Sequence, residues 1–142
     1  MSYLPSTFTL FMAPGTISPA DSTTYYFCQA SNIATTTDTN NDYNVGFAFL
    51  VTGAIITVSN NTVSGSTESN TLSLRNTTQA TSTTIGTFTT DGSATVVRTT
   101  TITGLNISVA EGDSVACQWL TPAWATNPTT MLIRVTLICQ RI

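Results

Sequence analysis

The chain has 142 residues, of which 41% are hydrophobic and only 8% are charged, with no histidine and no lysine. This length suits one domain, and the high apolar content excludes a disordered chain, which combines low hydrophobicity with high net charge. The four arginines are scattered and the pI is near 4.3, so the chain lacks the clustered cations that a nucleic-acid partner requires.

The first 22 residues contain a β-prone run, STFTLFM, which Pro14-Gly15 and Pro19 separate from the rest. Proline and glycine are the strongest local breaks in a chain. We therefore predict an N-terminal arm or extra strand over residues 1–22 and a β-sandwich domain over residues 23–142.

The apolar side chains of this run leave two interpretations open. The run can fold back as a further strand of its own sheet, or it can pair with the edge of a neighbouring subunit. In the second case an assembly interface is expected at Phe8, Leu10, Phe11 and Met12.

The rest of the chain shows short alternating runs separated by turn residues, and no sustained helical spacing. We predict strands near residues 24–29, 44–51, 54–59, 71–75, 83–89, 94–103, 114–120 and 129–140. Because no helices are available to connect parallel neighbours, these strands are expected to pair antiparallel in an all-β sandwich. Asp91-Gly92 is the best candidate for a tight hairpin.

Two apolar strands indicate where the core lies. In the last strand, Ile133, Val135, Leu137 and Cys139 alternate with more polar residues, which is typical of a strand with one buried face. Residues 47–51 are apolar on both faces. They predict a strand that is central in the sandwich or covered by a second subunit.

The three cysteines form no CxxC motif, so they indicate neither a disulfide framework nor a zinc site. The longest apolar stretch, residues 45–58, is shorter than the roughly 20 residues of a spanning helix, and we expect no membrane association. The N-terminus lacks the basic region of a signal peptide. The protein is therefore expected to stay in the cell that makes it, or to leave by lysis.

Catalytic motifs are missing from the sequence. Without histidine, Ser-His-Asp and Cys-His arrangements are excluded, and without lysine there is no Schiff-base chemistry. The seven acidic residues form no pair whose spacing assigns acid and base roles. We predict that the protein is not an enzyme.

Two short segments carry candidate binding residues. Asp38, Asn40 and Asp42 have the spacing of the first ligands in many calcium loops, but the glycine and glutamate of an EF-hand are missing. They are interpreted as a polar turn or a weak Ca²⁺ site, and no other cofactor is expected. Trp124 lies in a loop between two prolines, where it could cover its own barrel end, anchor a subunit contact or stack on a glycan.

Several segments together carry a resemblance to a known family. They are YYF at 25–27, VTGAI at 51–55, TLSLR at 71–75, GLNISV at 104–109 and EGDSV at 111–115, followed by a long apolar strand. This order resembles the jelly-roll domains, similar to C1q and tumour necrosis factor, of bacteriophage virion proteins such as fibre tips and capsid decoration proteins. The Gly-Asp turn before a core strand is its sharpest element, and the resemblance covers residues 25–142.

The resemblance implies a trimer or larger homo-oligomer with strand faces packed at a symmetry axis, and it implies no catalytic residues. We therefore expect a non-enzymatic structural subunit of a virion or other extracellular assembly, whose partners are itself and other structural subunits. Two alternatives stay open: the repeating subunit of a filament joined by donated N-terminal strands, and a receptor- or glycan-binding tip module.

Overall fold

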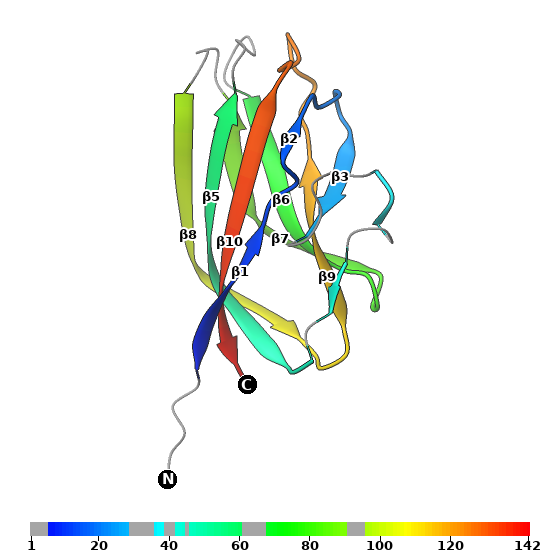
Figure 1. Ribbon diagram of the computed structural model, residues 1–142, viewed down its shortest axis with the longest axis vertical. Helices are drawn as coiled ribbons and strands as arrows, with labels where there is room; N and C mark the ends of the chain where they lie inside the picture. Colours follow the sequence, from blue (N-terminus) through cyan, green and yellow to red (C-terminus); the bar gives the residue numbers. More distant parts are fainter. Residues whose placement is uncertain (1–5, 29–35, 39–41, 45, 61–67, 91–95) are drawn as a thin grey trace.

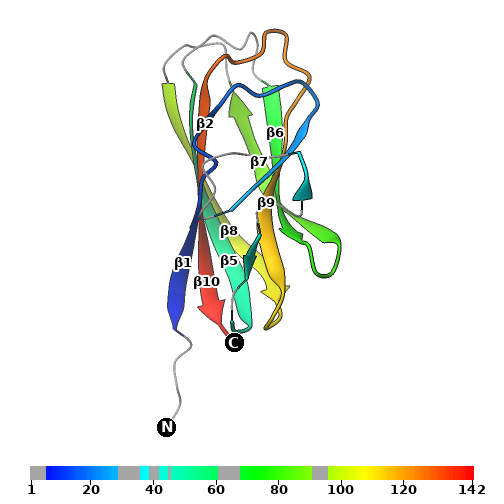
Figure 2. The same ribbon diagram turned by 45° about the vertical axis from the view of Figure 1, so that its right-hand side comes forward.

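The computed structural model describes residues 6–28, 36–38, 42–44, 46–60, 68–90 and 96–142. Two antiparallel sheets pack against each other, seen one behind the other in Figure 1 and side by side in Figure 2. Within these residues there is no α-helix, and none that could span a membrane. The predicted all-β, antiparallel sandwich is confirmed.

One sheet, here called sheet A, contains both ends of the described chain. Its strands are ordered β1-β10-β5-β8, and the short β2 also pairs with β10. Their bounds are β1 Thr7–Met12, β2 Thr16–Ile17, β5 Phe49–Asn60, β8 Val96–Val109 and β10 Met131–Arg141. The first and last strands of the chain are therefore direct neighbours.

The second sheet, sheet B, is ordered β3-β9-β6-β7, and the short β4 also pairs with β9. Its strands are β3 Thr24–Phe27, β4 Tyr43–Asn44, β6 Glu68–Asn76, β7 Thr81–Thr90 and β9 Ser114–Leu120. β6 and β7 form a hairpin within the sheet. The connections from β2 to β3, from β4 to β5, from β5 to β6, from β7 to β8, from β8 to β9 and from β9 to β10 all join one sheet to the other.

The tight hairpin predicted at Asp91-Gly92 is wrong. β7 before it belongs to sheet B and β8 after it belongs to sheet A, so the two strands are not paired with each other. The dipeptide itself lies outside the described residues. Turn propensity indicates that the chain reverses, but it does not determine whether the next strand returns to the same sheet.

The two strands predicted at residues 44–51 and 54–59 are in fact one long strand, β5, with Tyr43–Asn44 forming the separate β4. The register shifts on both sides of β5 between Val51 and Gly53, which is a β-bulge. A Cβ atom on Gly53 would lie only 2.9 Å from the carbonyl oxygen of Ile102. Glycine is needed here because the β8 backbone approaches it closely, and it does not end the strand.

The core lies between the two sheets. In β10 the residues predicted to share a buried face, Ile133, Val135, Leu137 and Cys139, are all fully buried, which confirms that prediction. Opposite them, sheet B contributes Trp119, Phe27 and Leu72, also fully buried. β5 is apolar on both faces, and it lies between β10 and β8 as a central strand of sheet A.

Candidate functional site

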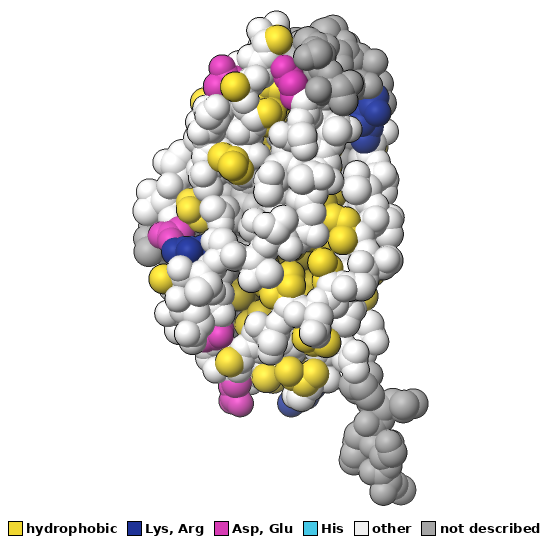
Figure 3. All heavy atoms as spheres, turned by 180° about the vertical axis from the view of Figure 1, so that it is seen from behind, with side chains coloured by type: hydrophobic (Ala, Val, Ile, Leu, Met, Phe, Trp, Pro, Cys, Tyr) yellow, Lys and Arg dark blue, Asp and Glu magenta, His cyan; other side chains and the backbone are white. Residues whose placement is uncertain are grey.

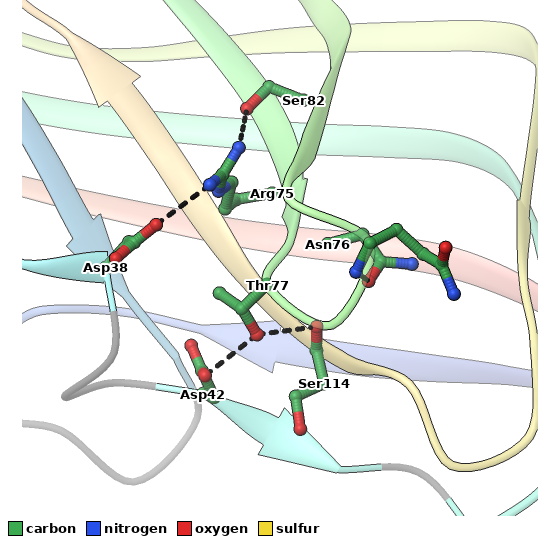
Figure 4. A network of polar contacts seen from close by, with 8 residues as sticks. Asp38, Asp42, Arg75, Asn76, Thr77, Ser82 and Ser114 are labelled. Carbon is green, nitrogen blue, oxygen red and sulfur yellow. Dashed lines mark hydrogen bonds and ion pairs between the residues drawn. The ribbon is translucent and has the colours of Figure 1, made fainter.

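The two described residues of the predicted calcium loop, Asp38 and Asp42, bind different protein partners (Figure 4). Asp38 forms an ion pair with Arg75 of β6 over 2.9 Å, and the Asp42 carboxylate accepts a hydrogen bond from Thr77 Oγ1 over 2.8 Å. Asn40 lies outside the described residues. Each described carboxylate is thus used to attach the segment before β4 to sheet B, as expected for the polar-turn interpretation.

One oxygen in this network has no protein partner. Asp42 Oδ1 is buried and accepts no hydrogen bond. The described part of the chain contains no group of three or more acidic or sulfur side chains that could hold a metal ion. A Ca²⁺ site at Asp38, Asn40 and Asp42 stays a prediction, and Asp42 Oδ1 is the one buried side-chain oxygen of the described residues there that lacks a protein partner.

The neighbouring turn before β9 is held by a third carboxylate. Asp113 accepts hydrogen bonds from the Asn76 side chain over 2.7 Å, from Gln79 over 3.3 Å and from the Ala110 N–H over 3.3 Å. These bonds stabilise the charged form, with that from Asn76 the largest contribution, and they lower the pKa of Asp113. Gly112, in the same turn, has a φ of 84°. The Gly-Asp turn thus joins the β8–β9 connection to the β6–β7 hairpin.

Trp124 is buried, with 5% of its surface exposed. Its ring packs edge-on against Trp119 at a centroid distance of 6.5 Å, and its indole N–H donates to Thr90 Oγ1 over 3.0 Å. The assignment of Trp124 to a subunit contact or a glycan site required an exposed ring, so it is corrected. The loop folds down because the indole gains both a hydrophobic neighbour and a buried acceptor.

The N-terminal run forms β1, which pairs with β10 of its own chain from Thr7–Gln140 to Met12–Val135. Leu10 and Met12 are buried in the core, so their predicted place in an assembly interface is wrong for this arrangement of the chain. Phe8 packs edge-on against Phe49 at 5.6 Å. Of the predicted interface residues, Phe11 is exposed, at 46%, and Phe8 is half-buried.

Phe11 belongs to a larger surface that the sequence did not reveal. Paired residues of neighbouring strands share a face, and Phe11 pairs with Thr136, Thr136 with Ile55, and Ile55 with Thr101. This row crosses all four long strands of sheet A on the side that faces away from the core. We call that side the outer face of sheet A.

The outer face of sheet A is apolar and nearly free of charge. Beside Phe11 and Ile55 it carries Ile138, Leu132, Leu50 and Val97, with threonine and serine between them. The strands of this sheet contain no Asp or Glu, and Arg134 is the one ionised residue that alternation places on this face. A surface with so few charges is poorly suited to remain in contact with water.

The opposite surface of the molecule is more polar. Figure 3 views the protein from the side of sheet B, and uncharged polar and backbone atoms dominate, although hydrophobic atoms gather over the lower part of the view. Paired rows on the outside of sheet B consist largely of hydroxyl and amide residues, for example Gln118 with Ser73 and Thr71 with Thr87. Leu120, at 44% exposure, is an exception.

All three cysteines are buried, including Cys139 on the predicted apolar face of β10. Burial disfavours the thiolate and raises the pKa of Cys139 to about 12, and it raises the pKa of Cys117 still further. Cys117 also lies 3.3 Å from the sulfur of Met12. These thiols serve as small core residues.

Comparison with models of known protein families finds no match to this chain, and comparison with curated proteins finds none either.

Proposed function

We propose that the protein is a non-enzymatic structural subunit that associates with copies of itself through the outer face of sheet A. The observation that carries this proposal is the composition of that face: apolar side chains and threonines, no carboxylate, and the single charge of Arg134. Burying such a face removes apolar area from water without leaving carboxylates unpaired.

The arrangement of strands supports a jelly roll of the kind that the sequence resembles. Repeated crossings between two sheets, with the terminal strands β1 and β10 adjacent in one of them, are what two interlocked Greek keys produce. The resembling family consists of virion subunits such as fibre tips and decoration proteins. We therefore propose a virion or other extracellular assembly as the place of action.

The test measures mass in solution with a matched pair of variants. Light scattering coupled to size exclusion is expected to give a multiple of the 15.0 kDa chain mass. Thr136 and Thr71 are both half-buried threonines on central strands, Thr136 on the outer face of sheet A and Thr71 on the outside of sheet B. Thr136→Lys should lower the mass of the assembly by disrupting contacts through the outer face of sheet A, whereas Thr71→Lys should leave the mass unchanged.

Circular dichroism of both variants establishes that they remain folded. A wild-type protein that is monomeric at all concentrations would exclude self-association. Equal effects of the two substitutions would show that the outer face of sheet A is not the surface involved.

A further inference from the structure

Each sheet of the sandwich ends in open edges, and these edges differ in length and regularity. β1 is followed by Pro14-Gly15, and β3 and β4 are only 4 and 2 residues long. β7 is divided by a register shift opposite Leu72 and Ser73. β8, by contrast, pairs with β5 without a shift from Val96 to Thr103. This segment is the longest regular edge among the described strands.

The β8 edge also carries few of the devices that protect most sheet edges. Natural edges carry lysine, proline or bulges that prevent pairing with another strand. Residues 97–103, VRTTTIT, contain no lysine, proline or bulge, and their single charge is Arg98, which pairs with core-facing Val58. All the other residues of the segment are β-branched, the type that favours extended pairing. Val97 is 67% exposed, and Thr99, Thr101 and Thr103 are exposed beside it. In Figure 1 β8 lies at the left margin of sheet A, with no described strand beyond it.

We infer that the edge formed by residues 97–103 pairs antiparallel with the same segment of a second copy, across a two-fold axis that passes through Thr100. This inference rests on the proposed self-association and specifies one contact within it. A strand edge paired antiparallel with itself is self-complementary, because each residue meets its partner twice, once on each side of the axis. Sheet A thereby becomes one sheet continuous across two subunits.

The register follows from charge and from the ends of the regular segment. With Thr100 opposite Thr100, Arg98 lies opposite Ile102, and the two arginines are separated by about four residues, or about 13 Å. Shifting the axis to Arg98 would place like charges directly opposite, which is unfavourable. The chosen register also uses the whole segment up to Gly104, where φ is 74° and the regular pairing with β5 ends.

In the same register, outer-face residues of one copy lie opposite outer-face residues of the other. Thr99 meets Thr101, and Val97 meets Thr103, all on the outer face of sheet A; Thr–Thr pairs across strands are favourable. The outer faces of the two subunits are then continuous. Edge pairing therefore enlarges the apolar surface that is available for other subunit contacts.

Disulfide cross-linking tests both the edge and the register. Thr99→Cys and Thr101→Cys proteins are mixed and oxidised; directly opposed Cα atoms lie about 4.5–5.5 Å apart, within disulfide range. In Thr99→Cys alone the two cysteines would be about 8 Å apart, beyond that range. The native cysteines are buried and do not compete. The mixture should form covalent dimer in several-fold higher yield than either variant alone.

The matched control uses Thr87→Cys and Thr89→Cys, two exposed threonines with the same spacing on the other long edge, β7. Their mixture should give no dimer above the level of random collision. Equal yields of covalent dimer for both edges would overturn the inference. A disulfide between a Thr101→Cys protein and a Thr9→Cys protein would also overturn it, because that link indicates a donated N-terminal strand at the β8 edge. If light scattering shows an oligomer but the β8 mixture does not link, the edge contact is wrong while self-association stands.

Discussion

The indole N–H of Trp119 donates a hydrogen bond to Asn70 Oδ1 over 2.9 Å, deep between the two sheets. The Asn70 amide in turn donates to Thr90 Oγ1 over 3.4 Å, the same oxygen that accepts the indole N–H of Trp124. Both tryptophans can be buried because each polar hydrogen has an acceptor. Asn70 is fully buried in this chain of bonds.

Replacing Asn70 by leucine is expected to destabilise the fold by about 1–3 kcal/mol, because the Trp119 N–H is left buried without an acceptor. Urea unfolding monitored by tryptophan fluorescence measures the change. Ser69→Ala, at the exposed neighbouring position, should stay within about 0.5 kcal/mol. Adding Trp119→Phe to the Asn70→Leu variant should cost less than it does in the wild type, and full additivity would argue against the coupling.

Gly53→Ala should be destabilising because the new Cβ would meet the Ile102 carbonyl oxygen at 2.9 Å, and a backbone atom within a sheet has little room to move. We expect a loss of about 1–3 kcal/mol in the free energy of unfolding. Gly46→Ala is the matched control, since nothing lies within 4 Å of its added Cβ. Equal losses from the two substitutions would show that the close approach at the bulge does not constrain residue 53.

Asp113 should make stability depend on acid pH. Its folded pKa is lowered by the hydrogen bond from Asn76 and by those from Gln79 and Ala110, so it lies below the unfolded value of about 3.9. The stabilisation is complete above the unfolded pKa and is lost as pH falls through the folded pKa. Urea unfolding across the acid range should show a weaker pH dependence for Asp113→Asn than for the wild type.

Glu111→Gln provides the control for this experiment, because Glu111 is exposed in the same turn. It should retain the wild-type pH dependence. A pH profile of Asp113→Asn that matches the wild type would contradict the role given to the Asp113 carboxylate.

The thiols should be unreactive in the folded protein. Burial raises the pKa of Cys139 to about 12, and since the thiolate is the reactive species, a thiol reagent at mildly alkaline pH should modify the native protein very slowly. All three cysteines should react at once in denaturant. A Thr87→Cys variant, with its thiol exposed on the outside of sheet B, should add one rapidly reacting thiol. Rapid modification of the native wild type would contradict the buried positions.

The buried face of β10 could be predicted because alternation with a period of two is a local property of the sequence. The course of β5 could not. Gly53 has the composition of a turn, and whether a glycine ends a strand or occupies a bulge depends on the neighbouring backbone, here that of Ile102. Local sequence does not contain that information.

The candidate surface was harder to predict for the same reason. Phe11 was identified as an interface residue, but its row with Ile55 and Thr136 exists only through pairing between strands distant in the chain. For Trp124, the interpretations as a subunit contact and as a glycan site are wrong. The sequence near Trp124 does not show its hydrogen-bond acceptor, Thr90, which lies 34 residues away. Pairing between distant strands determines both features.

The position of β10 between β1 and β5 has a consequence during synthesis. β1 has no partner in its own sheet until β10, which lies far along the chain, has been synthesised, so β1 lacks that partner while the strands between them are made. Folding that depends on such a distant pairing is slow. In a crowded site of assembly, this interval is when β1 of one molecule could pair with β10 of another.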